Sequence, residues 1–207
     1  MTIAPALLAF LIAATILTIT PGLDTALVLR SAAAGGTRPA AFAAIGIALG
    51  CLVWGAIVAI GLGALLAASE LAYAVLRWAG AAYLLWLGFH LVLRPRRRFD
   101  APARGDRRPD QWEALRQGFF TNLLNPKVGI FYISFLPQFV PAGTDVATLT
   151  FLLAAIHVLL GLIWFSALIV ATVPIARLLR RPAVVRVMDR LTGGLFIMFG
   201  AKLVVSR

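Results

Sequence analysis

Two short polar interruptions stand inside long apolar runs of this sequence. The first holds Pro21, Gly22 and Asp24, and the run from Met1 carries no charged side chain before Asp24. Proline lacks an N–H and clashes with the preceding helical turn, whereas glycine permits backbone angles that other residues avoid. A carboxylate in hydrocarbon is costly unless it faces a cavity or a partner. This interruption therefore predicts a broken membrane helix that opens onto a polar site.

The second interruption contains Asn122, Asn125, Pro126 and Lys127, again between apolar stretches. Two broken helices in corresponding positions of a chain indicate the binding site of a secondary transporter. We therefore expect the two interruptions to form one site.

The residue types of these interruptions suit a zwitterionic ligand. Asp24 is expected to bind an amino group, helped by the backbone carbonyls that Pro21 leaves free. Asn122 and Asn125 carry donors for a carboxylate, and Lys127 supplies a positive charge. The alternative is that Asp24 and Lys127 pair only with each other, and such a pair would open when substrate binds.

Asp24 is also the best candidate for a proton carrier. Burial and a nearby Lys127 would act on its protonation in opposite directions, so the sequence leaves its charge state open. His157 is more typical of a hydrogen-bonded structural residue than of a functional one, although its helix could turn it toward the site. Thr18 and Thr20 are expected to bond to carbonyls that Pro21 frees.

Composition indicates an integral membrane protein. Of 207 residues, 61% are hydrophobic and 13% are charged, and the mean hydropathy is +0.94; soluble domains have about 45–50% apolar residues. The net charge of +11 is concentrated in short segments, which excludes a nucleic-acid-binding surface because such proteins are not apolar between their basic patches.

The single cysteine, Cys51, excludes an intramolecular disulfide. The N-terminal apolar run has no basic n-region, so it predicts a membrane helix rather than a signal peptide.

The chain divides into six expected helices. They span residues 4–30, 40–69, 71–93, 113–136, 145–174 and 187–205, with the first broken at Pro21-Gly22 and the fourth at Asn125-Pro126. Turns are expected at 31–39, 70–77 and 137–144. We therefore predict an all-α membrane fold of three units: a three-helix repeat at 1–93, a basic linker at 94–112, and a second three-helix repeat at 113–207.

The basic residues predict an orientation. Arginines gather at 30–38, 94–116 and 177–190, all on one side of a six-span chain, and cytoplasmic loops are enriched in Lys and Arg. We therefore expect a multi-pass protein of the bacterial inner membrane with a cytoplasmic central loop and both termini outside. Lys202 and Arg207 oppose this orientation.

An internal repeat supports six spans. Residues 80–92 align without gaps on 192–204, and Gly88 then matches Gly200. Because each half has three helices, the second half must be inverted. Gly46 and Gly50, at GxxxG spacing, indicate close helix contact; we favour contact within one chain over a homodimer.

The motifs together resemble a known family. Thr-Pro-Gly-x-Asp at 20–24, Asn-Pro-Lys at 125–127 and Phe-Leu-Pro-Gln-Phe at 135–139 are similar to motifs of the lysine exporter (LysE/RhtB) family of bacterial amino-acid exporters. The resemblance covers essentially the whole chain, but Leu23 stands where the family usually has a second proline. It implies export of an amino acid or a close derivative across the inner membrane, driven by protons.

Three other functions remain as alternatives. A divalent-metal exporter would need more ligands than Asp24, two asparagines and one histidine provide. An enzyme would need a nucleophile beside a base, or cysteine and histidine ligands for a redox cofactor, and the chain has one Cys and two His. A purely structural membrane protein would not need Asp24 or paired helix breaks. We therefore expect a transporter without enzyme activity or cofactor, and a small neutral amino acid as its substrate.

Overall fold

The computed structural model describes residues 3–96, 110–141, 143–179 and 181–205, and this part of the chain is helical without strands. The helices are α1 (Ile3–Ile19), α2 (Leu23–Gly35), α3 (Thr37–Ala68), α4 (Glu70–Leu93), α5 (Gln111–Leu123), α6 (Pro126–Ile130), the π-helical η1 (Phe131–Phe135), the 3-10 turn η2 (Leu136–Phe139), α7 (Val146–Val170), α8 (Thr172–Leu179) and α9 (Pro182–Val205). The predicted all-α class is confirmed for the described residues.

Two of the described helices are long and apolar enough to cross a membrane by themselves, over Thr37–Gly61 in α3 and Val146–Val170 in α7. Helices α1 and α2 pass the same test as one span bent by 51°. Helix α4 adds a shorter apolar stretch, Trp78–Leu93. By length and composition the described residues therefore contain two candidate spans, or three if the bent pair is one, and the predicted break in the first helix is confirmed.

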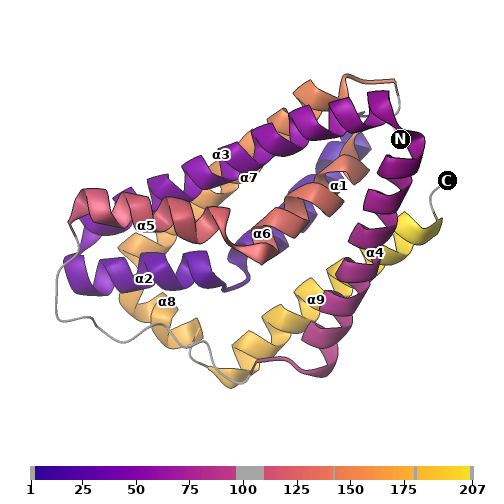
Figure 1. Cartoon of the computed structure of the whole chain (residues 1–207). Coiled ribbons are helices and arrows are strands. Elements are labelled where there is room, and N and C mark those ends of the chain that lie inside the picture. The colour runs from indigo at the N-terminus through magenta and orange to yellow at the C-terminus, as the bar shows by residue number, and fades with distance from the viewer. Residues whose placement is uncertain (1–2, 97–109, 142, 180, 206–207) are drawn as a thin grey trace.

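Helices α3 and α7 pack against each other along the length of the molecule, and α5 packs on α3 (Figure 1). Helices α4 and α9 form a second pair, and α1 and α6 lie between the two pairs (Figure 1). The core is apolar and rich in aromatic rings. Its largest fully buried side chains include Phe10, Tyr132, Phe131, Phe135 and Phe196. In a membrane, close packing of such rings stabilises helix association through van der Waals contacts, because lipid is as apolar as the core.

The predicted glycine seam lies within one chain. A Cβ on Gly46 would come within 2.0 Å of the Leu115 carbonyl oxygen, and one on Gly50 within 2.7 Å of Asn122 Oδ1. Both neighbours are on α5, so the glycines let α3 and α5 approach to backbone contact. The interpretation as contact within one chain is confirmed, and α5 covers the face that suggested a homodimer.

The two segments of the internal repeat, in α4 and α9, contact each other antiparallel. A Cβ on Gly88 would lie 2.8 Å from the Gly193 carbonyl oxygen, and one on Gly200 would lie 3.2 Å from that of Ala81. In the repeat alignment Gly88 matches Gly200 and Ala81 matches Gly193. The contact is therefore reciprocal, which is the pattern that a two-fold axis between two equivalent helices produces.

Several predicted boundaries are wrong. The turn expected at 31–39 is reduced to Gly36, whose φ of 85° lets the chain leave α2 and re-enter a helix at once. The turn expected at 70–77 is helical, because α4 begins at Glu70 and Ser69 alone separates it from α3.

The fifth expected helix ends early and the sixth begins early. Helix α7 stops at Val170, and the separate helix α8 covers the end of the fifth expected helix and the start of the basic segment at 177–190. Helix α9 starts at Pro182 rather than 187, because proline suits the first helical position. Most of the predicted linker, residues 97–109, lies outside the described residues.

Candidate functional site

The first helix break follows from the chemistry of proline. Pro21 has no N–H to donate to the carbonyl of Leu17, so α1 ends at Ile19. Gly22 has φ −147° and ψ −165°, which is extended backbone that any residue adopts. The break therefore does not use the conformational freedom that glycine suggested in the sequence.

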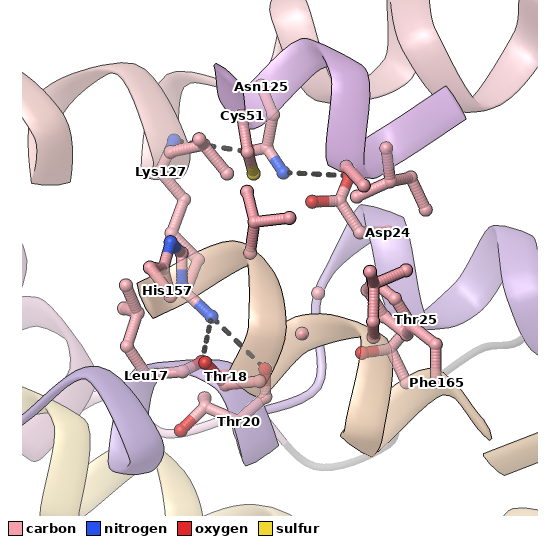
Figure 2. A pocket seen from close by; sticks show the side chains of 17 residues that line it. Leu17, Thr18, Thr20, Asp24, Thr25, Cys51, Asn125, Lys127, His157 and Phe165 are labelled. Carbon is pink, nitrogen blue, oxygen red and sulfur yellow. Dashed lines mark hydrogen bonds between the residues drawn. The ribbon is translucent and has the colours of Figure 1, made fainter. Parts of the chain in front are cut away.

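The side chain of Lys127, a residue of α6, reaches the C-terminal end of α1. Its Nζ donates to the carbonyl oxygens of Leu17 at 3.3 Å and Thr20 at 3.1 Å (Figure 2). A cation is stabilised at a helix C-terminus, where unpaired carbonyls and the helix dipole present negative charge. Thr18 and Thr20 instead bond to carbonyls of intact turns, those of Ala14 and Ile16, so the prediction that these threonines serve the freed carbonyls is wrong.

The second break separates α5 from α6. Asn125 caps α6, since its Oδ1 accepts a hydrogen bond from the Lys127 backbone N–H at 3.1 Å, and Pro126 takes the first helical position. Trp54 of α3 donates its indole N–H to the Leu123 carbonyl oxygen at 3.2 Å, at the end of α5. The predicted interruption of the fourth helix at Asn125-Pro126 is confirmed.

Asp24 faces this second break. Its carboxylate accepts hydrogen bonds from Asn122 Nδ2 at 2.8 Å and from Asn125 Nδ2 at 3.4 Å. Asp24 also lies in the first turn of α2, where the helix dipole favours a negative charge. The two asparagine amides thus hold Asp24 in this conformation, whereas the sequence suggested that they bind a ligand carboxylate.

Both charged residues line one small cavity, which we call cavity 1 (Figure 2). It has a volume of about 60 Å³. Its polar wall is formed by Thr18, Thr20, Asp24, Thr25, Asn125, Lys127 and His157. Within the described part of the chain the ion pair is Arg96–Asp189, so Asp24 and Lys127 do not pair with each other in this structure. Figure 2 shows the Lys127 ammonium directed toward α1 and the Asp24 carboxylate lying near Asn125.

A larger cavity, cavity 2, lies on the other side of the first break, against α4 and α9. Its volume is about 330 Å³. Its lining includes Thr20, Pro21, Gly22, Leu23, Tyr83, Leu87, Leu91, Arg96, Asn125, Pro126, Lys127, Thr192 and Phe196. Four of these residues, Thr20, Gly22, Asn125 and Lys127, also line cavity 1. The broken backbone is therefore the wall between the two cavities.

Arg96 and Asp189 form a link that sequence reasoning missed. Arg96 Nη2 lies 2.5 Å from an oxygen of Asp189, whose side chain is fully buried, and also donates to the Pro21 carbonyl oxygen at 2.9 Å. A hydrogen bond of 2.5 Å between the hydroxyls of Thr20 and Thr192 joins the same elements. Together these contacts attach α4 and α9 to the first break. The sequence shows a carboxylate near the start of α9, but it does not identify the partner of that carboxylate.

His157 lies in the wall of cavity 1. It is buried, and its Nδ1 lies 2.9 Å from the hydroxyl of Tyr132, a residue of η1. The position of His157 fits both interpretations of the sequence: it is a hydrogen-bonded residue of the core, and it also faces the cavity. Tyr132 was not singled out in the sequence.

The structure brings all seven predicted site residues together. Pro21, Gly22, Asn125, Pro126 and Lys127 line one or both cavities, and Asp24 lines cavity 1. Asn122 is fully buried behind Asp24 and lines neither cavity.

Comparison with known proteins identifies the family. The family model described as LysE type translocator matches residues 15–207. This chain belongs to the LysE type translocator family. A protein described as an uncharacterized membrane protein of Vibrio cholerae is 30% identical over 97% of this translocator and 97% of its own length. A homoserine/homoserine lactone efflux protein of Salmonella typhimurium is 27% identical, covering 96% of each chain. A leucine efflux protein of an Enterobacter species is 28% identical, covering 94% of this chain and 92% of its own.

No solved structure matches this translocator significantly.

Proposed function

We propose that this translocator exports an amino acid or a close derivative across the bacterial inner membrane as a proton-coupled secondary transporter. One observation carries the proposal: Asp24 and Lys127, each beside a helix break, line the same cavity without pairing with each other. Relatives described as homoserine and leucine efflux proteins support export of such compounds.

The two charges match the two ends of an α-amino acid. The Asp24 carboxylate would bind the amino group, while Asn122 and Asn125 hold two of its lone-pair positions. The Lys127 ammonium has three N–H donors, and two are used by the Leu17 and Thr20 carbonyls. The third would bind the substrate carboxylate. Because cavity 1 is small, substrate entry requires the helices around it to move apart.

Proton coupling is assigned to Asp24. An intramembrane carboxylate that faces a cavity is the usual carrier in proton-driven transporters. In the proposed cycle Asp24 holds the substrate amine when ionised, and protonation from outside releases the substrate. The proton then leaves on the inner side.

For the architecture we propose six spans in two inverted three-helix repeats. The spans are α1 with α2, then α3, α4, α5 with α6 and its continuation, α7, and α9. The reciprocal contact of Gly88 and Gly200 with α9 and α4 supports the inversion. Because Arg30, Arg94 and Arg181 fall at the inner ends of these spans, the basic linker would face the cytoplasm and both termini would lie outside.

A divalent-metal exporter is the alternative. In the described part of the chain no group of three or more His, Cys, Asp and Glu side chains gathers in a way that could hold a metal ion. The paired carboxylate and ammonium suit a zwitterion better than a cation, so we favour the amino acid.

Proteoliposomes loaded with labelled amino acids test the proposal, with and without a pH gradient. Wild-type protein should release a neutral amino acid faster when the gradient is imposed, and Asp24→Asn should abolish this acceleration. Full gradient-driven export by Asp24→Asn would refute the role of the carboxylate. If wild type exports no amino acid but moves a divalent cation, the proposed substrate is wrong.

A further inference from the structure

Cavity 2 differs from cavity 1 in size and in charge. At about 330 Å³ it is several times larger than cavity 1 at about 60 Å³. For comparison, an engineered apolar cavity of about 150 Å³ in another protein binds benzene. In this conformation cavity 2 thus has room for an amino-acid-sized molecule with an apolar side chain, whereas cavity 1 holds only a few waters.

One wall of cavity 2 is an apolar strip on α4. Tyr83, Leu87 and Leu91 are spaced four residues apart, so they lie on one face of the helix, and Phe196 of α9 completes the wall. Leu87 and Leu91 are half-buried in the chain. Such a surface binds an apolar group by removing it from water.

The lining of cavity 2 also carries two cations. Lys127 and Arg96 line the cavity, whereas the described lining residues include neither Asp nor Glu. Arg96 uses Nε and Nη2 for Asp189 and Pro21, which leaves the two Nη1 donors for a ligand. Asp24 is absent from this lining. The lining therefore offers two cations for a carboxylate and, among its described residues, no carboxylate for an amine.

We propose that cavity 2 is a separate entry site for a carboxylate with an apolar tail, and that it selects neutral substrates with apolar side chains. The inference rests on the proposed export function. Lys127 lines both cavities, so the same ammonium binds the carboxylate in cavity 2 and guides it to cavity 1, where Asp24 receives the amine. A substrate with a cationic side chain is rejected because Arg96 and Lys127 repel it.

Binding to purified protein in lipid nanodiscs, measured by calorimetry, tests the entry site. The probes are leucine, its 2-oxo acid, which lacks the amine, and leucinol, which lacks the carboxylate. The 2-oxo acid should bind wild type, and leucinol should bind about ten-fold more weakly or worse, because it loses hydrogen bonds to charged groups. Equal binding of leucinol and the 2-oxo acid, or no binding of the 2-oxo acid, would overturn the proposal.

Variants locate the site. Leu87→Trp fills cavity 2 and should remove 2-oxo acid binding, while the matched control Leu93→Trp, at an exposed position at the end of α4, should retain it. If Leu87→Trp does not fold, Leu91→Phe is the cavity-filling variant to measure instead. Unchanged binding in a folded filling variant would refute the location.

Asp24→Asn separates this inference from the proposed function. The variant should lose gradient-driven leucine export but keep 2-oxo acid binding, because Asp24 lies outside cavity 2. If binding were lost together with export, a single site would suffice and the entry site would be wrong. If wild type bound the 2-oxo acid as expected but exported no amino acid, only the proposed function would fail.

Discussion

Lys127 donates a hydrogen bond to the carbonyl of Leu17, the carbonyl that Pro21 deprives of its intrahelical donor. A second hydrogen bond joins the two breaks in the other direction. Asp24, just after the first break, accepts a hydrogen bond from Asn122 at the end of α5, just before the second break. A side chain of each half thus contacts the break in the other half: Lys127 pairs with the freed carbonyl, and Asp24 binds the two asparagine amides. Helix termini in a membrane need such partners, because no water is present to satisfy them.

Replacement of Lys127 by methionine should destabilise the protein as well as stop transport. The change leaves the Leu17 and Thr20 carbonyls unpaired, at a cost of about 1–3 kcal/mol for each buried group. Thermal unfolding in detergent should show a clear decrease in Tm. Lys202→Met, at an exposed position, is the control and should unfold like wild type. An unchanged Tm for Lys127→Met would show that these hydrogen bonds are not needed.

Asn122 should act on transport through Asp24. It lines neither cavity, yet its amide donates to the carboxylate at 2.8 Å. Asn122→Ala should therefore lower the export rate, and adding Asp24→Asn should cause little further loss. Coupling between residues in direct contact is about 0.5–3 kcal/mol, which a double-mutant cycle on export rates measures. Additive effects would mean that Asn122 has a role of its own.

Gly22→Ala should fold normally. The backbone at Gly22 is extended, and an added Cβ would lie 3.7 Å from Lys127 Nζ, an ordinary contact distance. Stability should stay within about 0.5 kcal/mol of wild type, as for changes that disturb no packing. Transport should change more than stability, because the methyl group enters the wall shared by both cavities. A large loss of Tm would reveal a steric requirement that this conformation does not show.

Gly46→Ala should separate α3 from α5. An added Cβ would meet the Leu115 carbonyl oxygen at 2.0 Å, and backbone cannot move aside as a side chain can. Overpacking costs about 1–3 kcal/mol or more. Gly61→Ala in the same helix, with no atom within 4 Å of the added Cβ, is the matched control. Equal Tm values for the two variants would contradict the observed helix contact.

Loss of Arg96 should be more harmful than loss of Asp189. Arg96→Gln removes the cation from a fully buried carboxylate, which keeps the hydrogen bond from the backbone N–H of residue 96, and the expected cost is about 3 kcal/mol or more. Asp189→Asn leaves a guanidinium whose side chain is 41% exposed and can reach water. Thermal unfolding of both single variants should give the lower Tm for Arg96→Gln. The reverse order would show that burial of Asp189 is relieved by another group.

The sequence located both helix breaks because their causes are local. Pro21 and Pro126 act on their own turns, so residue type and position are sufficient to predict where the helices stop. All seven predicted site residues lie at or next to these breaks in the sequence, so they were found together with the breaks. The extended backbone of Gly22 was not predictable, since glycine tolerates several conformations and the surroundings select one.

The partners of the site residues could not be predicted, because they come from distant parts of the chain. Arg96 and Asp189 are 93 residues apart, and nothing in the sequence pairs them. The helix boundaries near Gly36 and Glu70 were missed because a single residue is enough for the chain to turn there, whereas the sequence pattern favoured longer connections.

The distance along the chain between Asp24 and Asn122 also orders events during synthesis. Asn122 follows Asp24 by 98 residues, which a ribosome adds in roughly 5 to 20 s. Throughout that interval the nascent N-terminal half holds a carboxylate without its amide partners and a helix end without its lysine. Until the second half is inserted, these polar groups of the first half depend on the insertion machinery or on retained water for their hydrogen bonds.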